Sequence, residues 1–394
     1  MPRPVAMVTF STRPRGGAVH SLHLAEALMD QGQQVHVFAL GDPDQGFFRP
    51  TPVPYSVYRT PESDGTLEDK VWRSVDALFD NLERTVPGTY DIIHAQDCIA
   101  ARAACRLRDR HPEIQVIRTV HHIDDFSTEA LIECQHRSIL DPDLVLVVSR
   151  YWQHVVEDQY RIPSTVVTNG VDAGRFRRPE GFDAGPLRST VGAEDRIVLL
   201  TVGGIEPRKG SLELFEALAQ VKSERTDPPV LVVIGGHSFR DHSAYRDAAL
   251  ERAVELGLEE GSDYHLLGTV SDEDLVRWYH SADAFVFPSV KEGLGLAVLE
   301  ALAAGLPVLT TDIEVFREYL DHETALLVPP GDFRQLAAAL SRLVDEPDLR
   351  KRLGSGGPEI AARFTWEAAA AHHIEIYRGA SAGRPASIAR AESR

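Results

Sequence analysis

The stretch AFVFPSVKEGLGLAVLEALAAGLPVLTT occupies residues 284–311 and decides the fold of the second half of the chain. It opens with AFVFPS, an apolar run with the length and composition of a buried strand. A loop containing glycine follows, and then a segment over 296–304 in which apolar side chains recur at helical spacing. Gly305 stands where a helix should end, and PVLTT begins another strand. The stretch therefore predicts strand, loop, helix and strand, the repeating unit of a parallel α/β sheet.

Glu292 and Glu300 are the two acidic residues of this otherwise apolar stretch, one at the loop entrance and one a turn into the helix. A helix N-terminus carries roughly half a positive charge, so the backbone N–H groups of Gly295 and Leu296 are expected to face a phosphate. Carboxylates at both ends of such a phosphate suit a ligand rich in hydroxyl groups. Most glutamates are solvated surface residues, and that simpler explanation stays open beside this one.

The same alternation of strands and helices runs through the whole chain. A first series of strands is expected at 5–11, 35–40, 91–95, 116–120, 144–149 and 165–169. A second series is expected at 196–204, 230–236, 264–270, 284–289, 307–311 and 325–330. Strands that alternate with helices imply parallel sheets, and ligands of such sheets bind beyond the carboxyl ends of the strands.

The segment between the two series, residues 176–195, is rich in Pro, Gly and charge, as expected of a linker. We therefore predict an α/β protein with two doubly wound, Rossmann-like domains, 1–180 and 190–364, that face each other across a cleft. Whether the helix expected at 365–378 packs back on the first domain stays open. The small and polar tail, 379–394, is expected to be disordered.

Composition excludes several classes of protein. The chain has 59 acidic against 41 basic residues and a net charge of −18, which argues against nucleic acid as a partner. No apolar run reaches the roughly 18–20 residues that a membrane span requires. The three cysteines, Cys98, Cys105 and Cys134, fit no zinc-binding spacing and suit a reducing compartment. The sequence is therefore that expected of a soluble, cytoplasmic protein without a transmembrane segment.

The opening stretch also has a specific resemblance. A strand ending in FPS, followed by E-G-x-G-L-x-x-L-E-A-x-A-x-G-x-P-V, resembles the E-x7-E signature of retaining glycosyltransferases of family 4, which have the GT-B fold. The resemblance implies that Glu292 lies near the donor sugar and that Glu300 binds the donor ribose. It also implies that the backbone at Gly295 and Leu296 faces the donor phosphates. The stretch contains a partial G-x-G-x-x-G, but Val298 replaces the third Gly, which disfavours a dehydrogenase.

GGIEPRKG, residues 203–210, resembles the phosphate-binding segment of the same family, in which an Arg and a Lys neutralise the donor diphosphate. Lys209 matches that Lys. The Arg that the family usually has directly after the glycine of the strand is absent, because Gly204 stands there, and Arg208 is the candidate replacement. The order Lys-Gly distinguishes this segment from a Walker A loop. A solvated turn with two basic residues is the alternative.

Two segments of the first domain continue the resemblance. TRPRGGAVHS, residues 12–21, resembles the glycine-rich loop of the family, and Gly16 and Gly17 would let donor phosphate or acceptor approach the backbone. An ordinary turn between strand and helix is the alternative. In TVHHIDDF, residues 119–126, the family places a His that contacts the donor sugar; His121 is the match and His122 the other register. No HxH or HExxH spacing accompanies these residues, so we expect no metal site.

Two further segments of the second domain belong to the same pattern. LGTVSDEDL, residues 267–275, resembles the stretch whose backbone reads the nucleobase, with Val270 nearest. Gly236 ends another strand that should reach the cleft. NGVD, at 169–172, resembles the segment that closes the first domain.

The resemblance implies a retaining glycosyltransferase that moves a sugar from a nucleotide diphosphate donor to an acceptor hydroxyl, without a metal or another cofactor. Arg208, Lys209 and the helix N-terminus would stabilise the departing diphosphate, while Glu292 and His121 would position the sugar. Two alternatives stay open, a nucleotide-sugar epimerase of the same fold and a non-catalytic protein that binds nucleotide sugars.

Overall fold

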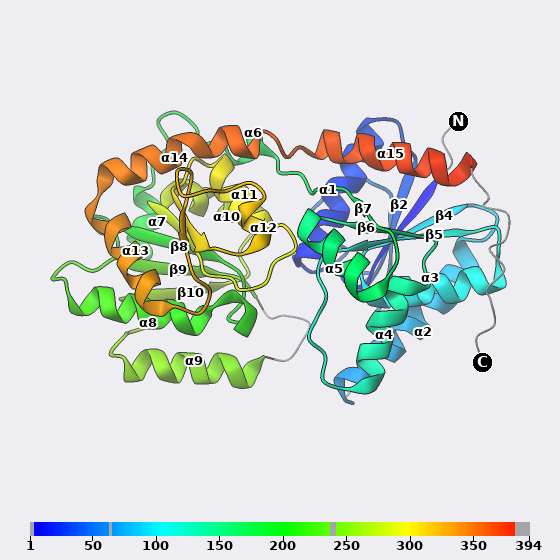
Figure 1. Ribbon diagram of the computed structural model, residues 1–394, viewed down its shortest axis with the longest axis horizontal. Helices are drawn as coiled ribbons and strands as arrows, with labels where there is room; N and C mark the ends of the chain where they lie inside the picture. Colours follow the sequence, from blue (N-terminus) through cyan, green and yellow to red (C-terminus); the bar gives the residue numbers. More distant parts are fainter. Residues whose placement is uncertain (1–3, 63–64, 237–241, 383–394) are drawn as a thin grey trace. The chain divides into compact units, whose positions relative to one another are not determined.

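The structure is a computed structural model that describes residues 4–62, 65–236 and 242–382, and these residues form two compact units (Figure 1). Unit 1 contains the described residues of Met1–Val148, Trp152–Thr168 and Trp366–Arg394. Unit 2 contains those of Ser149–Tyr151 and Asn169–Thr365. Each unit is a parallel sheet covered by helices, which confirms the predicted pair of doubly wound α/β domains.

The sheet of unit 1 has seven strands in the order β3-β2-β1-β4-β5-β6-β7, and all neighbouring strands are parallel. The direction in which the chain adds strands reverses between β1 and β4. The strands are β1 (Val5–Thr9), β2 (Val35–Gly41), β3 (Tyr55–Arg59), β4 (Ile92–Ala95), β5 (Gln115–Val120), β6 (Leu144–Val147) and β7 (Thr165–Val166). Every residue of β1 and β4 is buried, because helices cover both faces of a central parallel strand.

Helices flank this sheet in the order of the sequence. They are α1 (Gly16–Asp30), α2 (Leu67–Thr85), α3 (Cys98–Arg110), α4 (Glu129–Leu140), α5 (Arg150–Tyr160) and, from the far end of the chain, α15 (Trp366–Ala382). Helix α15 packs along α1 (Figure 1), and the ring of Trp366 stacks on His23 with centroids 5.5 Å apart. The helix expected at 365–378 therefore belongs to unit 1.

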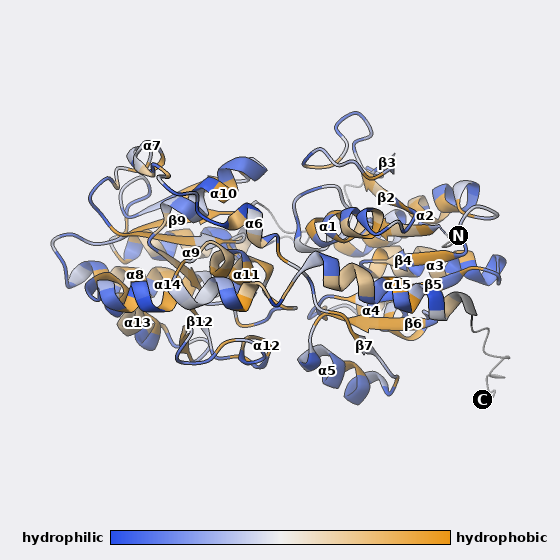
Figure 2. Cartoon of the chain, turned by 90° about the horizontal axis from the view of Figure 1, so that it is seen from above, coloured by the Kyte–Doolittle hydropathy of each residue, from blue (hydrophilic) through white to orange (hydrophobic). Residues whose placement is uncertain are grey.

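The sheet of unit 2 has six parallel strands in the order β10-β9-β8-β11-β12-β13 and reverses between β8 and β11. The strands are β8 (Val198–Val202), β9 (Val230–Ile234), β10 (Tyr264–Gly268), β11 (Ala284–Phe287), β12 (Val308–Thr311) and β13 (Leu326–Val328). Strands such as β9 are coloured hydrophobic in Figure 2, as expected for strands buried between helices.

The helical segments of unit 2 lie before, between and after these strands. They are α6 (Ala173–Phe176), α7 (Gly185–Ser189), the 3-10 turn η1 (Pro207–Lys209), α8 (Ser211–Ser223), α9 (Ser243–Glu255), α10 (Asp272–Ser281), α11 (Leu296–Ala303), α12 (Glu314–Arg317), α13 (Phe333–Asp345) and α14 (Pro347–Ala361). A core cluster joins α8 and α13 to the sheet, with Leu218 and Leu340 packed near Leu199 and Leu231. Both helices thus pack against the part of the sheet that contains β8 and β9.

Each strand predicted from the sequence is present, but several boundaries differ. Strand β3 was not predicted, because this edge strand is only partly buried and lacks a continuous apolar run. Helix α1 begins at Gly16, so Gly16 and Gly17 are helical and not part of a loop. Residues 379–382 continue α15 as helix, and the remainder of the predicted disordered tail, 383–394, lies outside the described residues.

The segment predicted as a linker, 176–195, belongs to unit 2, and so does NGVD at 169–172. The ring of Phe176 meets the buried Tyr279 edge to face at 5.3 Å. Arg188 donates from Nε to the carbonyl oxygen of Ser281 and forms an ion pair with Asp283 at 2.7 Å. These contacts, which composition does not reveal, bind the segment to unit 2.

Within the described part of the chain, no helix has the length and apolar character needed to span a membrane.

Candidate active site

The site residues of unit 2 that the sequence predicts lie at the carboxyl edge of its sheet. They follow four strands that are neighbours in that sheet. Arg208 and Lys209 follow β8, and Gly236 follows β9. Val270 follows β10, while Glu292, Gly295 and Leu296 follow β11. The strand order reverses between β8 and β11, and ligands of doubly wound sheets bind at such a switch point.

The backbones that leave β8 and β9 lie in direct contact. A Cβ atom added to Gly204 would lie 2.6 Å from the carbonyl oxygen of Gly236, so no side chain fits at position 204. This contact explains why the Arg expected directly after the glycine of the strand is missing here. A basic side chain can reach the edge of β8 only from a later position, and Arg208 occupies one.

Glu292 gathers the two basic side chains. Lys209 Nζ donates to Glu292 Oε1 at 2.7 Å, and Arg208 Nη1 donates to the same oxygen at 3.1 Å. Ser289 Oγ also donates to this oxygen at 2.7 Å, and Arg208 Nε pairs with Glu206 Oε2 at 3.1 Å. The side chains of Lys209 and Glu292 are only 13% and 11% exposed. The structure therefore brings Arg208, Lys209 and Glu292 together as one buried ionic network.

The charges of this network control its pKa values. Burial alone would raise the pKa of Glu292, but Lys209 and Arg208 outweigh it and lower that pKa to about 2. Burial lowers the pKa of Lys209, and the Glu292 carboxylate opposes that shift. The ammonium also lies 4.3 Å from the centroid of the Phe287 ring, a cation–π contact. Glu292 is therefore a carboxylate at neutral pH, and Lys209 and Arg208 are the cations that keep it ionised.

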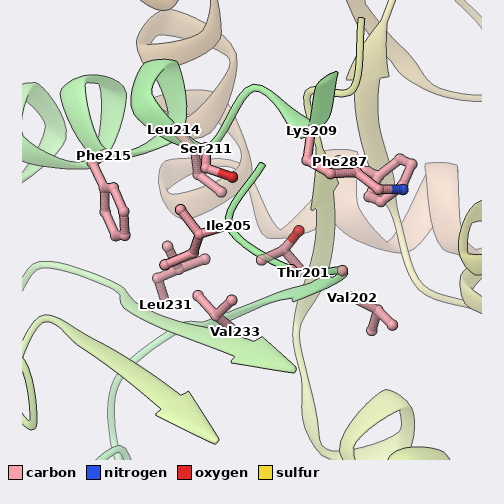
Figure 3. Close-up of a pocket in the computed structure, with 12 residues that line it drawn as sticks. Thr201, Val202, Ile205, Lys209, Ser211, Leu214, Phe215, Leu231, Val233 and Phe287 are labelled. Carbon is pink, nitrogen blue, oxygen red and sulfur yellow. The ribbon is translucent and has the colours of Figure 1, made fainter. Parts of the chain in front are cut away.

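A cavity adjoins this network (Figure 3). It is small, with a volume of about 20 Å³. Lys209 and Phe287 lie at one end, while Leu214, Phe215 and Leu231 lie at the other. Among the described residues that line it, Lys209 alone is charged. The positive charge of this cavity is therefore confined to the Lys209 end.

Helix α11 presents its N-terminus at the same edge. Gly295 is its N-cap with φ of 90°, and it has no side chain that could cap the first N–H groups. A Cβ atom at Gly295 would lie 2.6 Å from Cε1 of Phe316, so both the backbone angle and the neighbouring ring require glycine. The first N–H groups of α11, beginning at Leu296, are thus held in a fixed orientation suited to an anion.

Glu300 lies one turn into α11 in a different environment. The hydroxyl of Tyr279 donates to Glu300 Oε2 at 2.8 Å. Arg175, which pairs with Asp272 at 2.8 Å, also acts on this carboxylate electrostatically. Burial raises the pKa of Glu300 to about 7. The two glutamates of one motif therefore have opposite pKa shifts, since Glu292 has cations in contact and no described residue forms an ion pair with Glu300.

The site residues proposed for unit 1 lie at the carboxyl edge of its own sheet. Gly16 and Gly17 are the first two residues of α1, after β1. A Cβ atom at either glycine would meet nothing within 4 Å, so packing within the protein does not require glycine there.

His121 directly follows β5, and its Nε2 lies 3.2 Å from Oε1 of Gln96, which follows β4. Its ring meets His20 edge to face at 4.6 Å, and burial lowers its pKa well below the usual range. His121 is therefore neutral at physiological pH. His122 instead lies 3.5 Å from Oδ1 of Asp124.

Several residues of these sites were missed from the sequence. Tyr279, Ser289 and Glu206 contact the proposed residues of unit 2, and Gln96 and His20 contact His121. Ser289 is the last residue of a predicted strand and Gln96 comes directly after another, and these positions were an available signal. Tyr279 lies on a helix face that a hydrophobic pattern assigns to the core, so no local signal marks it.

Two sequence families match the chain. Residues 14–175 match the family described as Glycosyltransferase Family 4, and residues 187–359 match the family described as Glycosyl transferases group 1. The chain is similar to a D-inositol 3-phosphate glycosyltransferase of Saccharomonospora viridis, with 32% identity over 75% of this chain and 72% of the relative. It is also similar to a phosphatidyl-myo-inositol mannosyltransferase of Mycobacterium leprae, with 29% identity over 92% of this chain and 93% of the relative.

Solved structures share the fold. Sucrose-phosphate synthase from Thermosynechococcus elongatus superimposes with a TM-score of 0.80 and 23% identity, covering 96% of this chain and 99% of that one. The Anabaena protein HepE, solved in complex with UDP and glucose, superimposes with a TM-score of 0.78 and 20% identity, covering 96% and 100%.

The opposite pKa shifts predict opposite effects of pH on stability. The pKa of Glu300 is above its ordinary value of 4.5, so the wild-type protein loses stability as the pH rises from 4.5 through about 7. Glu300→Gln should therefore unfold at a higher temperature than wild type at pH 8, and the difference should disappear near pH 4.

The pKa of Glu292 is below 4.5, so its contribution is present above that pH and lost as the pH falls toward about 2. Glu292→Gln should unfold at a lower temperature than wild type at pH 8 and approach wild type in acid. Melting temperatures across the pH range check both effects. Shifts of the same sign at pH 8 would contradict the two environments.

Proposed function

This chain belongs to glycosyltransferase family 4 and is a hexosyltransferase enzyme with the GT-B fold, and from this premise we propose that its donor is a nucleotide diphosphate sugar. In this proposal the sugar passes to an acceptor hydroxyl with retention of configuration. Support comes from the site of unit 2, and the related fold of HepE was solved with UDP and glucose. The relatives are transferases, which does not favour an epimerase or a non-catalytic binding protein.

The ionic network at the switch point of unit 2 carries the proposal. Lys209 and Arg208 place two cations after β8, and the N-terminus of α11 places backbone N–H groups after the adjacent strand β11. A diphosphate has enough anionic oxygens to engage both sets of donors at once. In the structure Glu292 provides the negative charge that Lys209 and Arg208 require, and a diphosphate would compete for the same donors.

The remaining residues receive roles around that diphosphate. Glu300 binds the ribose hydroxyls, and the backbones at Gly236 and Val270 contact the nucleobase. Glu292 lies nearest the transferred sugar, between the phosphates and the acceptor. In unit 1, His121 contacts the sugar, and because it is neutral it forms a hydrogen bond without adding charge.

The proposed reaction breaks the bond between the anomeric carbon and the diphosphate oxygen, which leaves with the electron pair. Positive charge develops on the sugar and negative charge on the leaving diphosphate. Lys209, Arg208 and the N-terminus of α11 stabilise the leaving group, and the Glu292 carboxylate stabilises the sugar cation. The acceptor oxygen forms the new bond on the face that the diphosphate leaves, and its proton passes to a phosphate oxygen. These fixed positive groups take the role that a metal ion would have, so we propose a metal-independent reaction.

A thermal-shift screen of nucleoside diphosphates and their sugars tests the donor class first, because a ligand of the native state raises the melting temperature. The donor found in this way is then incubated with acceptor hydroxyl compounds, and the anomeric configuration of the product is determined by NMR. We expect a product with the configuration of the donor in buffer containing a chelator. An inverted product, or a strict requirement for a metal ion, would contradict the proposed mechanism.

Lys209→Met should weaken binding of the nucleoside diphosphate by about ten- to hundredfold, because a charge-assisted hydrogen bond contributes roughly 1.5–3 kcal/mol. The substitution keeps an apolar stem against Phe287. Titration calorimetry measures the affinity, and Lys351→Met, at an exposed position on α14, is the matched control. Equal affinities in the two variants would remove Lys209 from the phosphate site.

Glu292→Gln should separate binding from chemistry. It removes the anion that competes with the diphosphate, so the nucleoside diphosphate should bind more tightly than to wild type. It also removes the charge that stabilises the sugar cation, so the turnover number should fall by at least about a hundredfold. Wild-type turnover in this variant would show that Glu292 has no role in the reaction.

A further inference from the structure

Tyr279 is a buried polar side chain that the proposed function does not use. It lies on α10 and is fully shielded from solvent. Its ring is held edge to face against Phe176 at 5.3 Å and tilted against Phe285 at 5.7 Å. Its hydroxyl lies 2.8 Å from Oε2 of Glu300 and 3.3 Å from the carbonyl oxygen of Ala297. Packing on both sides therefore fixes where this hydroxyl points.

The hydroxyl of Tyr279 has one proton to donate, and the nearer, charged carboxylate is the stronger acceptor. Within the described part of the chain, Tyr279 is the one side chain that donates a hydrogen bond to the Glu300 carboxylate. Oε2 of Glu300 therefore accepts the hydrogen bond from Tyr279. In the proposal, Oε1 is the oxygen that accepts hydrogen bonds from the ligand. A single carboxylate oxygen can accept hydrogen bonds from both hydroxyls of a vicinal diol.

We propose that Tyr279 is a positioning residue that orients Glu300, so that Oε1 accepts hydrogen bonds from the vicinal 2′ and 3′ hydroxyls of the ribose in a nucleoside diphosphate. The inference rests on the proposed function, in which Glu300 binds the donor ribose. It adds that a side chain which does not touch the ligand determines how tightly the diol is held.

The charged surroundings of Glu300 provide a readout that a purely structural role would not change. Burial favours its neutral form, and Asp272, at the start of α10, adds to that effect. The hydrogen bond from Tyr279 favours the ionised carboxylate of Glu300. The guanidinium of Arg175, a residue of α6, also favours it. Without the phenol, Glu300 would take up a proton at a higher pH, and the protonated acid would lose acceptor capacity for the diol.

The test compares wild type with Tyr279→Phe, which keeps the ring and removes only the hydroxyl. UDP, GDP and ADP are titrated by calorimetry, and the tightest of them is used with its 2′-deoxy form between pH 6 and pH 9. Tyr264→Phe, at a buried tyrosine on β10 of the same unit, is the control. Glu300→Gln is measured alongside.

At pH 7 we expect Tyr279→Phe to bind the ribose nucleotide about tenfold more weakly than wild type does. The difference should shrink toward pH 9, where Glu300 is ionised in both proteins. The 2′-deoxy nucleotide keeps only the 3′ hydroxyl, so its affinity should fall less in Tyr279→Phe than that of the ribose nucleotide. Tyr264→Phe should match wild type throughout.

Three results would overturn the inference. An equal loss for both nucleotides at every pH would mean that Tyr279 only supports the fold. Unchanged binding in Tyr279→Phe, combined with weaker binding in Glu300→Gln, would refute the role of Tyr279 and leave the proposed function intact. Unchanged binding in both variants would instead refute the ribose role of Glu300 itself.

Discussion

The contact between Lys209 and Glu292 is the interaction on which the site of unit 2 depends. It joins two residues 83 positions apart in the chain, one after β8 and the other after β11. A charge shielded from water is costly unless an opposite charge lies in contact, so neither residue could stay buried and ionised alone. The parallel sheet makes the contact possible, because it brings the ends of β8 and β11 side by side where the strand order reverses. The fold brings the two charges into contact, and this contact lets both side chains stay ionised where they are buried.

The same edge gives two glutamates of one motif different chemistry. Glu292 has two cations and a hydroxyl on a single oxygen, and its pKa falls to about 2. Glu300 has a phenol and burial, and its pKa rises to about 7. A permanently ionised group suits the stabilisation of developing positive charge. A carboxylate that a neutral phenol helps to keep ionised suits the acceptance of hydrogen bonds from neutral hydroxyls. The spacing along the chain matters less than the neighbours that folding supplies.

The sequence predicted the architecture well, because the strands of both sheets are apolar runs that can be recognised from the sequence alone. The donor-site residues of unit 2 were identified through resemblance, and the structure gathers them at one edge; their roles stay predictions. What the sequence could not supply were contacts between distant segments. Phe176 packing on Tyr279 places 169–195 in unit 2, and no local composition encodes that contact. Tyr279 beside Glu300 and Gln96 beside His121 were missed for the same reason. The absence of an Arg after β8 follows from the contact of Gly204 with the backbone of Gly236, which the sequence alone does not reveal.

A crystal structure of the protein with a bound nucleoside diphosphate tests the central claim most directly, because that claim concerns which anion Lys209 engages. We expect the Lys209 ammonium within hydrogen-bonding distance of a phosphate oxygen, with the same phosphate at the N-terminus of α11 and Glu292 released from one of its cations. A diphosphate bound elsewhere, with Lys209 and Arg208 still directed only at Glu292, would contradict it.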